Sequence, residues 1–222
     1  MRSLLIKICG LSTEESIAAT IEAGADMIGL NFHPSSPRFV TLEHAARLAD
    51  FARARIGIVA LVVNADDGRL AEIRSAVSPE VWQFHGSETF ERIRDARAVL
   101  GMPVMRALGV SSSADLAAIS AYKQVADYVL LDAKPPKDAA YPGGHGRPFD
   151  WNLLAALPPG LPFMLSGGLS LANVGEAIRK IRGMGLSLQG VDLSSGVESA
   201  PGVKDLAKIK AFVAAVREAD TA

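Results

Sequence analysis

Two side chains in this sequence are suited to moving protons, and each ends a short apolar run. Cys9 is the single cysteine of the chain; it follows residues 4–8 and precedes Gly10. As a thiolate it could serve as a base or a nucleophile. A free thiol has a pKa of about 8.5, so positive charge from Lys7 or Arg38 would favour the thiolate. The competing interpretation is a small core residue, but the position at a strand end before a glycine favours chemistry.

Asp132 directly follows the apolar residues 128–131. A carboxylate in this place either caps a helix or acts as a catalytic acid, and no helical pattern begins at once, which weakens the capping interpretation. An acid must keep its proton near neutral pH. The pKa of Asp132 would therefore have to rise from about 3.9 through burial or a second carboxylate. Asp192, which follows another apolar run at residues 189–191, is the candidate neighbour.

Two turns rich in glycine and serine end the last two apolar runs. They are Gly167-Gly168 and Ser194-Ser195-Gly196. Glycines allow backbone amides to approach an anion, and a helix N-terminus favours negative charge. Ordinary tight turns would have the same composition. In eight-stranded α/β barrels, however, the loops after strands 7 and 8 often bind phosphate, and this pairing favours a phosphate site.

Arg38 and His85 complete the set of polar candidates. Arg38 lies in a proline-rich loop, and its planar guanidinium suits a carboxylate, although a solvated arginine is the usual case. His85 ends the run at residues 81–84, where a hydrogen-bonding role at the rim is the simplest interpretation. The four histidines include no His-x-His or His-x-x-x-His pair, so we predict no catalytic metal.

These candidates depend on the elements that precede them. Short apolar runs bounded by glycine or polar residues predict buried strands, and the segments between them have helical patterns. We predict strands at residues 4–8, 27–30, 56–63, 81–84, 104–107, 128–131, 163–165 and 189–191. We predict helices after Ser12 and Thr13 and at residues 41–54, 67–77, 88–100, 113–122, 151–157, 171–182 and 203–217. Residues 31–39 and 133–148 are predicted loops because of their proline and glycine content.

Eight strand–helix units in succession predict parallel strands joined by right-handed crossovers. At eight units they predict a closed (βα)8 TIM barrel, with residues 1–222 forming a single domain. The main alternative is an open doubly wound sheet. The first strand lacks the Gly-x-Gly-x-x-Gly turn that would support this alternative.

The composition excludes several classes of protein. The net charge is −1, which gives no electrostatic basis for binding nucleic acid or an anionic membrane. No apolar run approaches the ~18 residues of a membrane span, and Lys7 interrupts the first run too early for a signal peptide. A lone cysteine favours a reducing compartment. We therefore expect a cytoplasmic protein with no nucleic-acid or membrane partner.

The chain resembles the phosphoribosylanthranilate isomerase family of tryptophan biosynthesis from end to end. Each matching segment is short, but their joint order and spacing are specific. Phe84, Ser166 and His145 depart from the leucine, alanine and threonine that are more usual there. The matching segments are Lys7-Ile8-Cys9-Gly10, Ser36-Pro37-Arg38, Gln83-Phe84-His85-Gly86, Leu131-Asp132, Gly143-Gly144-His145-Gly146 with Phe149-Asp150-Trp151, Ser166-Gly167-Gly168-Leu169, and residues 190–198 with Pro201-Gly202.

This resemblance implies a cofactor-free Amadori rearrangement. N-(5-phospho-β-D-ribosyl)anthranilate would become 1-(2-carboxyphenylamino)-1-deoxy-D-ribulose 5-phosphate. Asp132 would be the general acid that opens the furanose ring, and Cys9 the general base that removes the C2 proton. The remaining residues would bind the substrate: Arg38 the anthranilate carboxylate, the amides around Gly168 and Ser195-Gly196 the phosphate, with Asp192 and His85 lining the site. The partner would be this small molecule, and the protein a monomer or homodimer.

Two other functions remain as alternatives. A different phosphosugar barrel enzyme, such as a metal-dependent epimerase, would need histidine and aspartate ligands around a divalent ion. A binding protein without activity would have no need of both Cys9 and Asp132. A second substrate, such as a related aminoimidazole ribotide of histidine biosynthesis, is compatible with the same residues.

Overall fold

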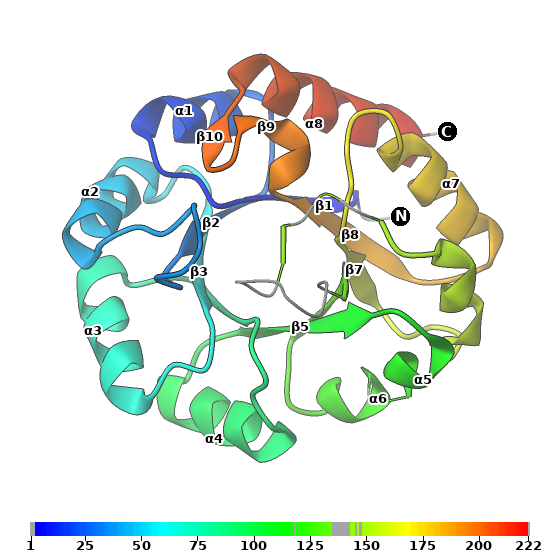
Figure 1. Cartoon of the computed structure of the whole chain (residues 1–222), viewed down its shortest axis with the longest axis horizontal. Helices are drawn as coiled ribbons and strands as arrows, with labels where there is room; N and C mark the ends of the chain where they lie inside the picture. The colour runs from blue at the N-terminus through cyan, green and yellow to red at the C-terminus, as the bar shows by residue number, and fades with distance from the viewer. Residues whose placement is uncertain (1–2, 118, 135–142, 145, 147, 222) are drawn as a thin grey trace.

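The computed structural model is a closed barrel of eight parallel strands with helices around its outside (Figure 1). The structure describes residues 3–117, 119–134, 143–144, 146 and 148–221. Each strand pairs with the next along the chain, and β8 pairs with β1 to close the ring. The strands are β1 (Leu5–Cys9), β2 (Met27–Asn31), β3 (Gly57–Val62), β4 (Val81–Phe84), β5 (Val104–Val110), β6 (Tyr128–Ala133), β7 (Phe163–Leu165) and β8 (Leu188–Leu193). The predicted fold is confirmed.

The helices follow the strands in the expected order, with two differences from prediction. The helices are α1 (Glu14–Glu22), α2 (Leu42–Ala52), α3 (Asp67–Val77), α4 (Phe90–Leu100), α5 (Ser113–Leu116), α6 (Ile119–Tyr122), α7 (Val174–Gly183) and α8 (Leu206–Thr221), with 3-10 helices η1 (Trp151–Ala156) and η2 (Ser195–Val197). The single helix predicted at residues 113–122 is two short ones. The last helix begins at Leu206, because Val203 and Lys204 form a strand instead.

That strand belongs to a small hairpin over the rim of the barrel. It is β10 (Val203–Lys204), which pairs antiparallel with β9 (Glu198–Ala200) around Pro201 and Gly202. Pro201 and Gly202, which directly precede the helix predicted at residues 203–217, form the turn between these two strands. The hairpin matters for function because it carries Glu198 and Lys204 to the mouth of the barrel.

Side chains that accept backbone hydrogen bonds fix the starts of the first helices. Thr13, Thr41, Asp66 and Thr89 each precede a helix and accept a hydrogen bond from the backbone N–H three residues later. Such caps satisfy donors that the first helical turn leaves open. They set the point at which the chain leaves the rim and turns back along the barrel.

Two hydrophobic layers hold the barrel together. The larger layer lies between the strands and the helices, and the smaller one fills the barrel interior. The interior layer includes Met27, Val59, Val81, Met105, Leu130 and Met164. Because strand side chains alternate between faces, residues two apart share the interior. This alternation places Lys7 and Cys9 of β1 on the same face as Leu5, above the interior hydrophobic layer.

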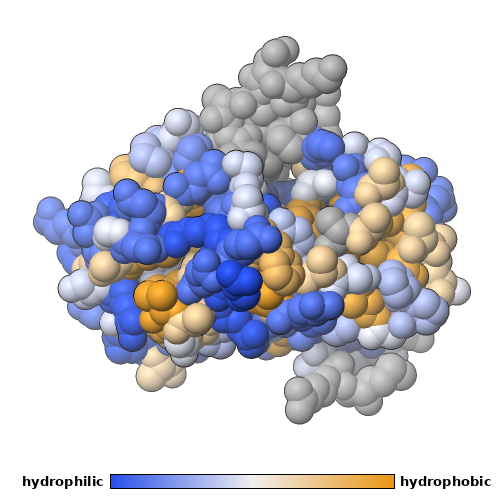
Figure 2. Space-filling model, turned by 90° about the horizontal axis from the view of Figure 1, so that it is seen from below, coloured by the Kyte–Doolittle hydropathy of each residue, from blue (hydrophilic) through white to orange (hydrophobic). Residues whose placement is uncertain are grey.

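The outer surface around α4 carries mainly hydrophilic side chains over the left and central parts of Figure 2. In the described part of the chain, no helix has the length and apolar character needed to traverse a bilayer. Nor do the described residues bring three or more potential metal-ligating His, Cys, Asp or Glu side chains together. The predicted loop at residues 133–148, including His145, lies largely outside the described residues.

Candidate active site

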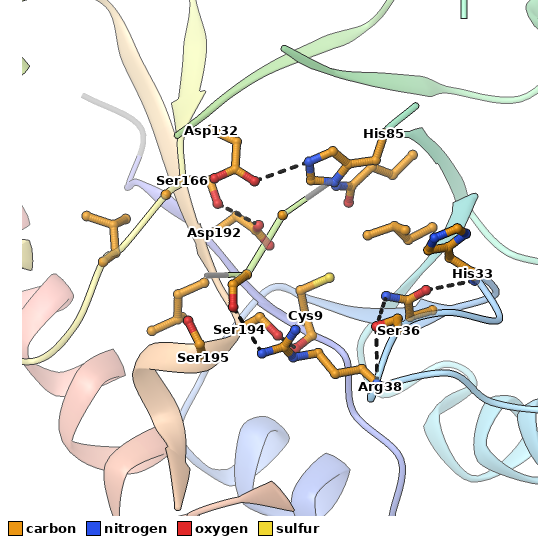
Figure 3. Close-up of a pocket in the computed structure, with 18 of the residues that line it drawn as sticks. Cys9, His33, Ser36, Arg38, His85, Asp132, Ser166, Asp192, Ser194 and Ser195 are labelled. Carbon is orange, nitrogen blue, oxygen red and sulfur yellow. Dashed lines mark hydrogen bonds and ion pairs between the residues drawn. The ribbon is translucent and has the colours of Figure 1, made fainter. Parts of the chain in front are cut away.

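A cavity opens at the carboxyl ends of the strands, and the sequence-predicted candidates converge on it (Figure 3). Including the open solvent at its mouth, the space measures about 620 Å³. Its wall contains all of the predicted site residues except Gly196. They are Cys9, Arg38, His85, Asp132, Gly167, Gly168, Asp192, Ser194 and Ser195. The prediction that separate strand ends form one site is therefore supported by their positions.

Cys9 lies beside a buried ion pair. It is the last residue of β1, and its side chain points into the cavity (Figure 3). Lys7 is fully buried below it, and Lys7 Nζ donates to Asp192 Oδ1 at 2.6 Å. Burial raises the pKa of the Cys9 thiol, and the Lys7 ammonium lowers it in part. Burial also disfavours charge on Lys7, but Asp192 and Cys9 outweigh it and raise the pKa of Lys7. A cation is thus held next to the thiol.

Asp192 is held in place from both sides. Its Oδ1 accepts from Lys7, and its Oδ2 accepts from Ser166 Oγ at 3.1 Å. Asp192 and Ser166 are each about 5% exposed, so these hydrogen bonds are largely shielded from solvent. From its place in the sequence, Asp192 was predicted to be a neighbour that raises the pKa of Asp132. Its hydrogen bonds connect it instead to Lys7, on the Cys9 side of the cavity, and to Ser166.

Asp132 lies inside β6 rather than after it, and it faces His85 across the cavity wall. Its Oδ2 is 3.2 Å from His85 Nε2, and its Oδ1 accepts from the backbone N–H of Ala133 at 2.8 Å. Asp132 is buried. The backbone of Gly143 lies close to this pair. A Cβ at this position would be 2.7 Å from Asp132 Oδ2 and 3.0 Å from His85 Nε2. The carboxyl group is therefore shielded from bulk water.

Arg38 is fixed by the rim hairpin. Arg38 Nε and Nη2 donate to the two carboxylate oxygens of Glu198 at 2.7 and 2.9 Å. Lys204 Nζ donates to the same Glu198 at 2.7 Å and to Ser194 Oγ at 3.0 Å. Gly10 makes room for this arrangement, since a Cβ there would be 2.5 Å from Arg38 Cδ. The two cations and one carboxylate leave a net positive charge at the rim.

The opposite charges of this cluster offset the effect of burial at Glu198 but only partly at Lys204. Burial would raise the pKa of Glu198, but Arg38 and Lys204 hold it below its ordinary value. Burial lowers the pKa of Lys204, and Glu198 opposes that effect. His33, on the same side of the cavity, has a pKa lowered by burial and by His85. A neutral imidazole is therefore favoured at His33.

The loops after β7 and β8 approach each other closely. Ser194 Oγ donates to the backbone oxygen of Cys9 at 2.9 Å, which ties this loop to β1. Gly167 and Gly168 have positive φ angles of 81° and 63°, which glycine adopts at little cost. Gly196 lies against the β7 loop, and a Cβ there would collide with the backbone oxygen of Leu169. Small residues therefore keep backbone amides near the cavity wall.

Several site residues were not selected from the sequence. Lys7 was considered only as a possible charge, and Gln83, Glu198 and Lys204 were not considered as site residues. A weak signal existed, since Lys7 and Gln83 are polar residues inside apolar strands. Such a position implies a paired role when both faces of the strand are buried. Glu198 ends the matching segment at residues 190–198, but no polar position inside an apolar strand marked it, and its role depends on the hairpin.

Comparison with known proteins agrees with this geometry. The family model described as N-(5'phosphoribosyl)anthranilate (PRA) isomerase matches residues 6–215. The N-(5'-phosphoribosyl)anthranilate isomerase of Nitrobacter hamburgensis is 52% identical over 218 residues, covering 98% of this chain and 95% of the relative. That of Bradyrhizobium diazoefficiens is 53% identical over 215 residues, covering 97% and 94%.

Solved structures give the same result. The crystal structure of phosphoribosyl anthranilate isomerase from Thermotoga maritima has a TM-score of 0.82 and 32% identity, covering 97% of this chain and 99% of that one. A second such structure, in complex with reduced 1-(o-carboxyphenylamino)-1-deoxyribulose 5-phosphate, has a TM-score of 0.79, 30% identity and the same coverage. With the family model spanning nearly the whole chain and relatives matching at about half identity, the chain belongs to the N-(5'-phosphoribosyl)anthranilate isomerase family.

Proposed function

We propose that this protein isomerises N-(5-phospho-β-D-ribosyl)anthranilate to 1-(2-carboxyphenylamino)-1-deoxy-D-ribulose 5-phosphate in tryptophan biosynthesis, with Asp132 as general acid and Cys9 as general base. The observation that carries the proposal is that these two proton-transfer groups, which come from β6 and β1, line one cavity. An aldose-to-ketose shift needs one proton delivered and one removed. Each transfer contributes roughly 10²–10⁴-fold when the group is well positioned.

The chemistry proceeds in three steps. Asp132 gives a proton to the furanose oxygen, the C1–O bond breaks, and the amine nitrogen forms a C1=N bond. The Cys9 thiolate then takes the C2 proton, and the electrons of that bond form the C1=C2 bond of an enolamine. Finally a proton leaves O2 and a proton arrives at C1, which gives the ketone. Substrate and product contain the same atoms, so no redox partner is required.

The substrate carries two anionic groups, and the cavity wall offers positively polarised regions for both. Arg38 is the proposed partner of the anthranilate carboxylate, and its ion pair with Glu198 fixes the plane of its guanidinium. The backbone around Gly168 and Ser195-Gly196 is the proposed phosphate site, where close loops bring amides together. Two anchors at separate places orient the sugar between acid and base.

We also propose that residues 1–222 form a single domain that works in the cytoplasm as a monomer or homodimer. One ring of strands joined at β1 and β8 supports a single cooperative unit. The free thiol of Cys9 supports a reducing compartment. A single unfolding transition, and light scattering of the purified protein, test the domain and its oligomeric state.

The test of the function is turnover by the purified protein, followed as loss of the fluorescence of the anthranilate substrate. Wild type should convert the substrate without added cofactor. Cys9→Ala and Asp132→Asn should each lose at least about 10²-fold in kcat while the fold survives. Wild-type turnover in either variant, with circular dichroism unchanged, would refute the role assigned to that residue.

A further inference from the structure

The ammonium group of Lys204 is enclosed in the rim of the barrel. Lys204 belongs to β10, and its side chain is 2% exposed. Its Nζ donates to Glu198 Oε1 at 2.7 Å, to the backbone oxygen of Ser194 at 2.9 Å and to Ser194 Oγ at 3.0 Å. An ammonium group carries three hydrogens, and these three acceptors use all of them. Any hydrogen-bonded effect of Lys204 on a ligand therefore passes through the residues that it holds.

Ser194, which Lys204 holds, belongs to the loop after β8. Ser194 and Ser195 line the cavity, and this loop carries amides that we assign above to the phosphate site. No peptide bond among the described residues is cis. In a trans peptide unit the carbonyl and the N–H of the next residue point in opposite directions. By fixing the carbonyl of Ser194, Lys204 therefore also fixes the direction of the Ser195 N–H.

The same side chain of Ser194 reaches the strand that carries the proposed base. Ser194 Oγ accepts from Lys204 Nζ and donates to the backbone oxygen of Cys9 at 2.9 Å. Ser194, Cys9 and Arg38 lie at the same end of the cavity (Figure 3). Lys204 thus holds the loop after β8 in a defined position relative to the end of β1.

Glu198 provides the negative charge that allows the ammonium group to be buried. An unpaired buried ammonium would be costly, and the Glu198 side chain beside it is only 5% exposed. Glu198 also accepts from Arg38 through both of its oxygens. The turn of the hairpin packs on the loop of Arg38, since a Cβ at Gly202 would be 2.4 Å from the backbone oxygen of Pro37. One carboxylate therefore joins the loop after β8 to Arg38.

We propose that Lys204 is a positioning residue for the phosphate of the substrate. It holds Ser194 so that the amides of this loop are set for the phosphate before the substrate arrives, and Glu198 keeps the ammonium group in place. The proposal rests on the isomerase function described above and deepens it. Neither proton transfer passes through Lys204, so its loss should act on binding rather than on chemistry. The alternative is direct attraction between the ammonium and the phosphate, without any role for the loop.

Binding of inorganic phosphate to the purified protein tests the proposal without turnover. An NMR titration that follows the amide signals of Ser195 and Gly196 gives the Kd. Lys204→Met removes the ammonium but leaves Glu198 paired with Arg38, and it should raise the Kd about tenfold. Lys204→Arg keeps the charge, but a planar guanidinium cannot direct its hydrogens at the same three acceptors, so the Kd should rise here as well.

An exposed lysine in the last helix provides the matched control. Lys210 Nζ lies 2.9 Å from Glu22 Oε2 on the outer surface, where the two side chains are 54% and 64% exposed. Lys210→Met removes the same charge and should bind phosphate as wild type does. Wild-type affinity in Lys204→Arg would show that charge alone suffices and would overturn the proposal, as would wild-type affinity in Lys204→Met. Circular dichroism checks the fold, and Lys204→Gln replaces Lys204→Met if the latter does not fold.

Glu198→Met separates position from charge by the sign of the change. It removes a negative charge near the proposed phosphate site, so Coulomb attraction alone would lower the Kd for phosphate. It also leaves Lys204 without its counter-charge and next to the cation of Arg38. The ammonium should then move away from Ser194, and the Kd should rise. A lower Kd in folded Glu198→Met would overturn the role of Glu198.

Amide hydrogen exchange in the ligand-free protein reports the order of the loop directly. Exchange at Ser195 and Gly196 should be faster in Lys204→Met than in wild type or Lys210→Met. In turnover, Lys204→Met should raise KM about tenfold with kcat little changed. Unchanged exchange, or a loss confined to kcat, would overturn the proposal. A wild type that binds phosphate without converting the anthranilate substrate would instead refute the proposed function and leave the role of Lys204 intact.

Discussion

Lys7 and Asp192 face each other across the seam that closes the barrel, with Lys7 Nζ 2.6 Å from Asp192 Oδ1. They are register partners between β1 and β8, although 185 residues separate them in the chain. Both are buried, and Cys9 follows two residues later on the same face of β1. One ion pair therefore contributes to the closure of the ring and also places a cation beside the proposed base.

The stability of the barrel should depend on whether this pair is removed whole or in part. Lys7→Met leaves Asp192 charged and buried, and should lower the free energy of unfolding by about 3–5 kcal/mol. Lys7→Met combined with Asp192→Asn removes both charges and should recover most of that loss, because Asn still accepts from Ser166. Urea denaturation measures both. A double variant as unstable as the single one would show that the charges are not coupled.

The same cation should tune the thiol. Burial raises the pKa of Cys9 above its ordinary value and Lys7 opposes this effect in part, so the thiolate fraction should increase with pH through the alkaline range. In Lys7→Met the midpoint should move to higher pH, since the lowering influence is gone. The rate of alkylation by iodoacetamide reports this midpoint cleanly, because Cys9 is the only cysteine. An unchanged or lower midpoint would show that Lys7 does not lower the pKa of the Cys9 thiol.

Glu198 should act on substrate affinity more than on chemistry. Glu198→Gln releases Arg38 from its bidentate partner, so the substrate carboxylate would have to order the guanidinium itself. We expect KM to rise about tenfold, the equivalent of roughly one charge-assisted hydrogen bond, with kcat little changed. Steady-state kinetics separate the two constants. A loss confined to kcat would assign Glu198 to the proton transfers instead.

The pH dependence of stability gives a further prediction for Glu198. Its pKa is lowered in the folded protein by Arg38 and Lys204, against the effect of burial. A depressed carboxyl pKa stabilises the fold above the ordinary glutamate value of about 4.3, and that stability is lost as the pH falls through the folded value. Glu198→Gln should therefore lose less stability than wild type between neutral and acidic pH. Thermal melts across that range measure the difference.

The sequence was sufficient for the fold and for the residues at the strand ends. Short apolar runs before Cys9, Asp132 and Asp192 placed these side chains on one rim, because parallel strands in a barrel share a carboxyl end. The pairings among them did not follow from the pattern. Lys7 contacts Asp192 only because closure of the ring makes β1 and β8 neighbours, which no local feature encodes.

The missed residues share a physical cause. Gln83 is polar within an apolar strand, and its importance becomes visible only when His85 Nδ1 is found at its amide. Glu198 and Lys204 depend on a two-strand hairpin whose strands are too short to produce a detectable alternation. A turn at Pro201 and Gly202 then resembles a helix start. Tertiary contacts, rather than local propensity, decide these positions.

Two glycines with the same backbone conformation offer a final, matched test of the acid. Gly167 and Gly160 have φ angles of 81° and 76°, so alanine at either position incurs a comparable conformational penalty, on the order of 1–2 kcal/mol. At Gly160 the new Cβ meets nothing within 4 Å, whereas at Gly167 it would be 2.9 Å from Asp132 Oδ1 and would collide with the backbone nitrogen of Ala133.

Gly160→Ala should therefore melt at a lower temperature with normal kcat. Gly167→Ala should in addition lose about 10²-fold in kcat, because a small displacement of the acid misaligns proton transfer. Equal activity in the two variants would mean that the position of Asp132 tolerates movement, and would argue against its role as the acid.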